Sequence, residues 1–183
     1  MNKQLIFLMG WETFCKGIQI YFKRYAWTNT ELPDFIRSMQ QGFDENRPDE
    51  ILDLNDWSQK WLQTKGVNKH SAEFEQADGN YTSFKIRQSH CKNADAVFRE
   101  QRINIGFYSD EGELIEKVEN VKILAQEVTT VEAINGKKVP AAVLLNCDDW
   151  GFGHFTMEDT AMKVFEERLG KMQSKIDRAV VIG

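Results

Sequence analysis

The first third of the chain repeats apolar and polar residues with the period of an α-helix. Across residues 11–25 the apolar side chains recur at steps of three and four positions: Phe14, Ile18, Tyr21, Phe22 and Tyr25. Such spacing is typical of an amphipathic helix, because positions three and four apart lie on one face. The pattern predicts a helix with a strongly aromatic face.

Two further helices are expected before residue 66. The second is predicted to follow the capping candidates Thr28, Asn29 and Thr30, to tolerate Pro33 in its first turn, and to be broken within residues 42–48. Its apolar positions are Phe35, Ile36 and Met39. The third begins near Asn55 and ends at Gly66, with Trp57 and Trp61 one turn apart on a face that we expect to be buried.

After Gly66 the hydrophobic period changes to two, which indicates β-strands with one buried face. Apolar residues alternate with polar or smaller ones at Phe84 and Ile86, at Ile103, Ile105 and Phe107, and at Val121 and Ile123. Residues 128–133 and the apolar run 143–145 are further strand candidates. Turns are predicted at residues 110–112 and, as a hairpin, at Asn135-Gly136. Many short strands with tight turns favour an antiparallel β-sandwich of about seven strands.

The helical period returns near the end of the chain. Thr156 and Asp159 resemble a capping box ahead of a helix through Met162, Phe165 and Leu169 that Gly170 would close, and a last helix is expected near Ser174. The predicted fold class is therefore α+β, with N-terminal helices, a central sandwich and C-terminal helices.

Composition and charge exclude several classes of partner. With 183 residues and 42% hydrophobic content, the chain can form one large domain or two small ones. A net charge of −5 argues against nucleic-acid binding, and the apolar runs are too short for a membrane span. The chain has an odd number of widely spaced cysteines, Cys15, Cys91 and Cys147, which favours a reducing compartment. We therefore expect a cytoplasmic protein.

The stretch LLNCDDWGFGHF, residues 144–155, is the strongest candidate for chemistry, because it places Cys147, Asp148, Asp149 and His154 close together in sequence. A zinc site needs three or four ligands on one point, and neighbouring residues at a strand end face opposite sides. Residues 149–153 carry turn chemistry instead. We therefore expect a strand end and a turn, with the aspartates capping backbone groups or facing solvent.

Both ends of the chain are unusually apolar. Residues 5–9 and 179–182 are hydrophobic runs with almost nothing beyond them, whereas natural termini are usually polar. We expect both to be places where a longer chain is interrupted. The alternative is a compact domain whose termini fold back into its core.

In order along the chain, four segments resemble a contiguous part of the zinc aminopeptidases of the aminopeptidase N family. KQLIFLMGWETFCKGIQIYFKRYAWTNTELPDFIRSM is similar to the helical end of the thermolysin-like catalytic domain, and LDLNDWSQKWLQTKGVN to the segment that closes it. VLLNCDDWGFGHFTM resembles the end of the family's β-sandwich domain, and KIDRAVVIG the start of its helical C-terminal domain. The resemblance implies domains at residues 1–66, 67–157 and 158–183.

The residues that the family uses for catalysis have no counterpart here. His70, His90 and His154 do not form HExxH, and no segment resembles the GxMEN loop that holds the substrate's amino terminus. We therefore predict no catalytic, cofactor-binding or metal-binding residue in this chain, although the resemblance implies zinc in the parent enzyme.

Two functional interpretations follow from the resemblance. In the first, the chain is a non-catalytic structural portion of a zinc aminopeptidase. Its partner is then the rest of that enzyme, and peptide substrates are met only through it. In the second, it is a stand-alone β-sandwich interaction module derived from the family. For an excised chain, we expect self-association through the helical face that carries Phe14, Ile18 and Tyr21.

Overall fold

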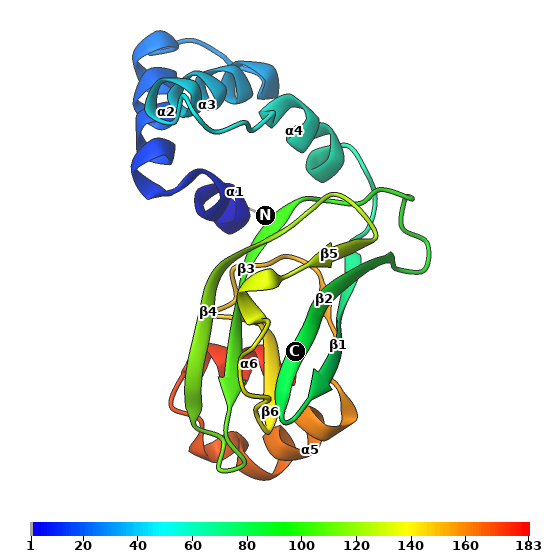
Figure 1. The fold of residues 1–183 in the computed structure, drawn as a ribbon. Coiled ribbons are helices and arrows are strands. Elements are labelled where there is room, and N and C mark those ends of the chain that lie inside the picture. The colour runs from blue at the N-terminus through cyan, green and yellow to red at the C-terminus, as the bar shows by residue number, and fades with distance from the viewer. Residues whose placement is uncertain (1) are drawn as a thin grey trace. The chain divides into compact units, whose positions relative to one another are not determined.

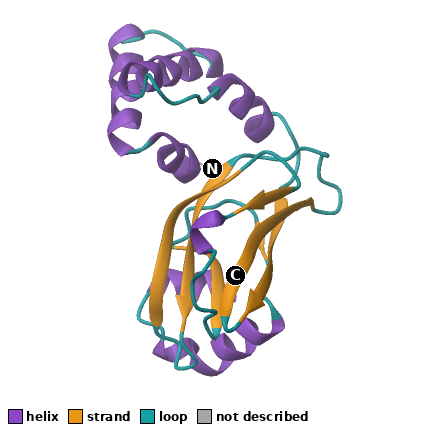
Figure 2. Ribbon diagram, in the orientation of Figure 1, coloured by secondary structure: helices purple, strands orange, loops and turns teal. Residues whose placement is uncertain are grey.

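The computed structural model describes residues 2–183. Residue 1, which belongs to the predicted segment 1–66, lies outside the described residues. It has the predicted α+β order of helices, strands and helices (Figures 1 and 2). The N-terminal helices are α1 Asn2–Met9, α2 Trp11–Arg24, α3 Leu32–Asn46 and α4 Leu54–Leu62. The strands are β1 Asn68–Ala77, β2 Asn80–His90, β3 Gln101–Tyr108, β4 Leu114–Ile123, β5 Val128–Thr130, β6 Ala142–Cys147 and β7 His154–Phe155. The remaining elements are η1 Glu132–Ile134, α5 Asp159–Arg168, η2 Leu169–Lys171 and α6 Lys175–Ile182.

The chain divides into two compact units, one ending at Thr64 and the other beginning at Lys65. In the first unit the four helices enclose one hydrophobic core. Buried members of that core include Leu5 and Met9 from α1, Met39 from α3, and Trp57 and Trp61 from α4. The predicted burial of the tryptophan pair is confirmed, with ring centroids 6.1 Å apart. The apolar run 5–9 therefore belongs to a helix whose inner side is covered by its own unit.

The second helix ends inside the predicted interval of residues 42–48, although Gly42 at the start of that interval does not itself interrupt it. The helix α3 continues through this residue to Asn46, because Gly42 lies where α3 meets α2. A Cβ atom at this position would stand only 2.5 Å from the backbone nitrogen of Gly17 on α2. The glycine pair lets the two backbones approach closely, so its role is in packing and not in chain termination.

The predicted helix boundaries also need correction. The N-cap of α3 is Glu31, which forms a capping box with Asp34, and none of the three predicted residues at 28–30 holds that position. The N-cap of α4 is Asp53, whose carboxylate accepts hydrogen bonds from the backbone N–H groups of Asn55 and Asp56. The helix ends at Leu62, before the predicted stop at Gly66.

The seven strands form two sheets, with strand orders β5-β2-β1-β7 and β4-β3-β6. All pairings are antiparallel except β1 with β7, which is parallel and differs from the predicted all-antiparallel arrangement. The two sheets share one core, to which β2 contributes Phe84, β3 contributes Ile105 and β6 contributes Leu145. The period-two pattern of the sequence therefore identified the side of β2 and β3 that faces this core, whereas β6 was expected from the continuous apolar run 143–145.

The Asn135-Gly136 hairpin was predicted wrongly. The strand β5 ends at Thr130 and is followed by the 3-10 turn η1, and the next strand, β6, belongs to the other sheet. Gly136 has a φ of 80°, which suits a turn, but this turn joins two sheets instead of two paired strands. The turn predicted at residues 110–112 does connect the antiparallel strands β3 and β4.

The C-terminal helices occur where expected, but the first begins differently. Thr156 does not cap α5, because its backbone N–H and its hydroxyl both donate to the carbonyl of His70; the N-cap is Glu158. The helix ends at Arg168, and the turn η2 runs through Gly170. The last helix, α6, has Ser174 as its N-cap, as predicted.

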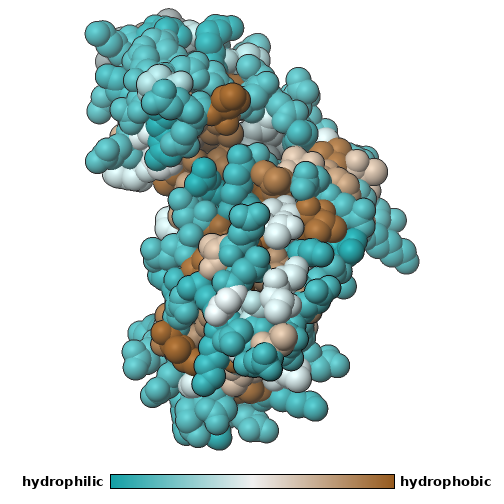
Figure 3. Space-filling model, in the orientation of Figure 1, coloured by the Kyte–Doolittle hydropathy of each residue, from teal (hydrophilic) through white to brown (hydrophobic). Residues whose placement is uncertain are grey.

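Hydrophobic side chains form separate patches on an otherwise hydrophilic surface (Figure 3). Within residues 2–183, no helix combines the length and the apolar character that a membrane crossing requires.

Candidate functional site

The stretch that drew attention in the sequence forms a strand end and a turn. Val143, Leu144 and Leu145 lie in β6 and Cys147 is its last residue. Asn146, Asp148 and Asp149 all have positive φ values, which Asn and Asp tolerate better than most residues. The side chain of Asn146 closes the turn by accepting a hydrogen bond from the backbone N–H of Gly151.

The four candidate side chains of this stretch differ in burial and do not converge on one point. Cys147 is buried, and burial together with the carboxylates of Asp148 and Asp177 raises the pKa of its thiol. Asp149 and His154 are exposed. Among residues 2–183, no three His, Cys, Asp or Glu side chains gather closely enough to hold a metal ion.

Asp148 neither caps the backbone nor simply faces solvent, contrary to the expectation. Its carboxylate accepts hydrogen bonds from Asn104 Nδ2 at 2.7 Å and from Lys117 Nζ at 3.0 Å, on β3 and β4. Partial burial opposes ionisation, but these two donors outweigh it and lower the pKa of Asp148. The residue therefore ties the turn to the neighbouring strands.

The most enclosed carboxylate of the region is Asp177, which the sequence analysis missed. Only 1% of it is exposed, and it accepts hydrogen bonds from the Tyr108 hydroxyl and from the backbone N–H of Asp148, both at 2.7 Å. Burial, reinforced by the bond to Asp177, raises the pKa of Tyr108. The only sequence signal was an acidic residue three positions after the N-cap Ser174.

A second buried polar group is His70 on β1, whose ring stacks on Phe155 with centroids 4.7 Å apart. The Gln101 amide is oriented by the backbone N–H of Phe152, which donates to its Oε1 atom at 3.0 Å. Gln101 Nε2 then donates to His70 Nε2 at 3.0 Å. Burial lowers the pKa of His70 from 6.5 to about 4, so the imidazole is neutral at pH 7.

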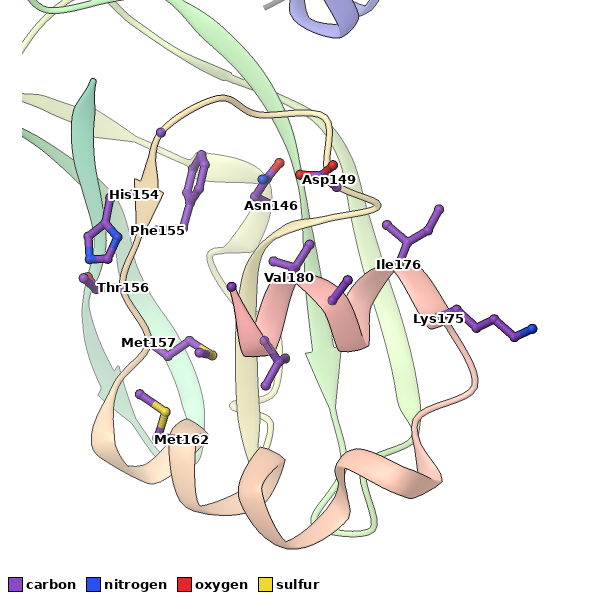
Figure 4. A pocket seen from close by; sticks show the side chains of 14 residues that line it. Asn146, Asp149, His154, Phe155, Thr156, Met157, Met162, Lys175, Ile176 and Val180 are labelled. Carbon is purple, nitrogen blue, oxygen red and sulfur yellow. The ribbon is translucent and has the colours of Figure 1, made fainter. Parts of the chain in front are cut away.

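An open groove of about 660 Å³ lies beside α6 (Figure 4). Ile176 and Val180 of α6 form one side, and Met157 and Met162 lie on the other. Asp149 and Lys175 contribute charge at the margin. The groove can cover apolar surface, but it lacks the convergent acid, base and nucleophile that catalysis needs.

The residues present do not fit the zinc of the aminopeptidase N family. The Nε2 atom of His70 already accepts from Gln101, His154 is exposed on β7, and the His90 ring stacks on Phe98 at 4.6 Å. No two of these histidines lie one helical turn apart on a helix, as HExxH requires.

Comparison with known proteins shows what these units are related to. No protein-family model matches the chain. Over an alignment of 186 residues, it is 34% identical to the aminopeptidase N of Streptomyces lividans. The chain is similar to one part of an aminopeptidase N. The alignment covers 97% of this chain but 21% of that enzyme, so the chain spans about a fifth of its relative's length. This similarity supports the resemblance that the four sequence segments indicated.

Proposed function

We propose that the chain is a non-catalytic structural portion of a zinc metallo-aminopeptidase of the aminopeptidase N family. The observation that supports this is the 34% identity to aminopeptidase N over almost the whole chain and only a fifth of the relative. The proposed domains are the end of the catalytic domain at residues 1–66, a β-sandwich domain at 67–157 and the start of a helical domain at 158–183.

The reaction of the parent enzyme would be removal of amino-terminal residues from peptides. Zinc polarises the scissile carbonyl and activates water in such enzymes, and its ligands would come from residues outside these 183. The polar side chains of this chain serve the fold instead. Asp177, Asp148 and His70 are each held by neighbours within the second unit.

The proposed partner is the rest of the parent enzyme. Peptide substrate would bind to that enzyme and not to this chain alone. The apolar groove beside α6 is a surface of the kind that a neighbouring part of such an enzyme covers. We place the protein in the cytoplasm, because Cys15, Cys91 and Cys147 are all unpaired.

The second candidate function is a stand-alone interaction module. The observation in its favour is the outer side of α2, where Trp11 and Phe22 are exposed. Large exposed aromatic side chains mark surfaces that bind other proteins.

A chimera tests the first proposal. The segment of Streptomyces lividans aminopeptidase N that aligns with this chain is replaced by residues 1–183, and hydrolysis of aminoacyl arylamides is measured. We expect zinc-dependent activity in the chimera, none in a control enzyme that lacks the segment, and none in the isolated chain. A folded, zinc-loaded chimera without activity, or turnover by the isolated chain, would contradict the proposal.

A further inference from the structure

The boundary between the two units falls between Thr64 and Lys65. Such boundaries usually lie in flexible linkers that few contacts cross. In this chain the residues that open the second unit are held by residues 91–99, which follow β2 and which we call the boundary loop. The boundary therefore differs from an ordinary linker on the side of the second unit.

Both backbone groups of Lys65 are bonded to one residue of the boundary loop. The backbone N–H of Lys65 donates to Asp95 Oδ2 at 2.7 Å, and the backbone N–H of Asp95 donates to the carbonyl of Lys65 at 3.1 Å. The two bonds involve the peptide groups before and after Lys65. They fix the direction of the backbone at this residue, although its side chain is exposed.

Gly66 packs directly against the boundary loop. It has a φ of 78°, and a Cβ atom at this position would stand only 2.5 Å from the Cβ atom of Ala94. Glycine is the residue that tolerates both the positive φ and this close contact. The glycine that the sequence suggested as a helix stop therefore serves packing within the second unit, and it is not a point of free rotation.

Arg99 anchors the far end of the boundary loop inside the second unit. Only 2% of this residue is exposed, its Nη1 atom donates to Asn68 Oδ1 at 2.8 Å, and its backbone N–H donates to Gln88 Oε1 at 2.8 Å. Asn68 Nδ2 in turn donates to the carbonyl of Val97 at 2.8 Å. Burial lowers the pKa of Arg99, and the carboxylate of Asp95 opposes this effect. The loop thus has a fixed base, and Asp95 interacts with both Lys65 and Arg99.

We propose that the boundary loop is a releasable clamp on Lys65 and Gly66, and that Asp95 is the residue that closes it. When the clamp is closed, Lys65 and Gly66 belong to the folded second unit. When it opens, residues 65–67 become a flexible linker, so the clamp sets how freely the chain bends at the boundary. Opening is local, because Asp95 and Lys65 are both exposed and β1 need not unfold.

This inference rests on contacts within the second unit and is tested separately from the aminopeptidase proposal. Trypsin cleaves after lysine, and its rate at the Lys65–Gly66 bond of the full chain follows the population of the open clamp. We expect slow cleavage in the unchanged chain and cleavage about fivefold faster in Asp95→Ala, because one hydrogen bond is lost. The matched control is Asp110→Ala, an exposed acid in the turn between β3 and β4, which should not change the rate. Mass spectrometry identifies the fragment that ends at Lys65.

Hydrogen exchange of the Lys65 backbone amide measures the clamp directly, and circular dichroism checks that each variant is folded. Asp95→Ala should speed exchange of this amide about fivefold, whereas Asp95→Asn should keep most of the protection, because its amide oxygen can still accept the bond. Gly66→Ala should also speed exchange, since its Cβ atom displaces Ala94. The proposal would be overturned by an Asp95→Ala chain that trypsin cuts no faster than Asp110→Ala, or by Lys65 exchange that neither Asp95→Ala nor Gly66→Ala changes.

Discussion

At the scale of single residues, Asp177 joins the last helix to the sheet. Its carboxylate holds the Tyr108 hydroxyl of β3 and the backbone N–H of Asp148 after β6. Because both donors are buried or partly buried, removing the acceptor leaves them without a partner, which costs more than the bonds themselves contribute.

Replacing Asp177 by alanine is therefore expected to lower the free energy of unfolding by about 3 kcal/mol. Tyr108→Phe removes one donor and leaves the backbone bond in place, so a loss of about 1 kcal/mol is expected. Urea denaturation measures both. Glu166→Ala, an exposed acid on α5, is the control and should change stability by less than about 0.5 kcal/mol. An Asp177 variant as stable as that control would show that the carboxylate does not anchor α6.

His70 makes stability depend on pH in a defined direction. Burial lowers its pKa in the folded protein to about 4, against 6.5 for the ordinary group, so the unfolded chain binds a proton more readily. The stabilising effect of the neutral imidazole is complete above pH 6.5 and is lost as the pH falls towards 4.

Between pH 7 and pH 5 the protein should therefore lose about 2 kcal/mol of unfolding free energy through this residue. Urea denaturation at several pH values measures the slope. Most carboxylates titrate below this window, which isolates the histidine. His70→Gln should flatten the dependence, and an unchanged slope in that variant would assign it to another group.

At the scale of elements, the contact between α2 and α3 depends on two glycines. Sequence rules treat a glycine within a helix as a weak point, because it costs about 1 kcal/mol relative to alanine. Here that cost is offset by the close approach of the helices, which no other residue allows. The same contact explains why α3 passes through Gly42 and ends later in the predicted interval of residues 42–48, at Asn46.

Gly42→Ala should consequently destabilise the first unit by about 2 kcal/mol, despite the better helix propensity of alanine. The tryptophan fluorescence of Trp57 and Trp61 during denaturation follows this unit. Gly170→Ala is the matched control, because a Cβ atom at position 170 meets nothing within 4 Å. If Gly42→Ala raised the free energy of unfolding, the close contact between α2 and α3 would not contribute to stability, and the prediction would be wrong.

At the scale of the whole molecule, the chain consists of two compact units that meet at residues 64 and 65. Each has its own hydrophobic core, the first built from helices and the second around two sheets. Units with separate cores are expected to fold independently.

Residues 65–183 produced alone should therefore unfold in one cooperative transition. Denaturation followed by circular dichroism measures this property. A truncated chain without a cooperative transition would contradict independent folding.

The sequence by itself determined the elements whose signal is local. The hydrophobic period identified α2, the Trp57–Trp61 face of α4 and the buried sides of β2 and β3, because burial on one face imposes that period wherever it occurs. The continuous apolar run 143–145 identified β6, which is buried on both faces. Tertiary structure decided the features that depend on distant partners. The Gly17–Gly42 contact, the change of sheet after residue 136, the neutral His70 and the burial of Asp177 each require groups that lie far apart in the sequence. No local pattern encodes such partners, because the free energy of a buried polar group or a close backbone contact depends on what surrounds it in space.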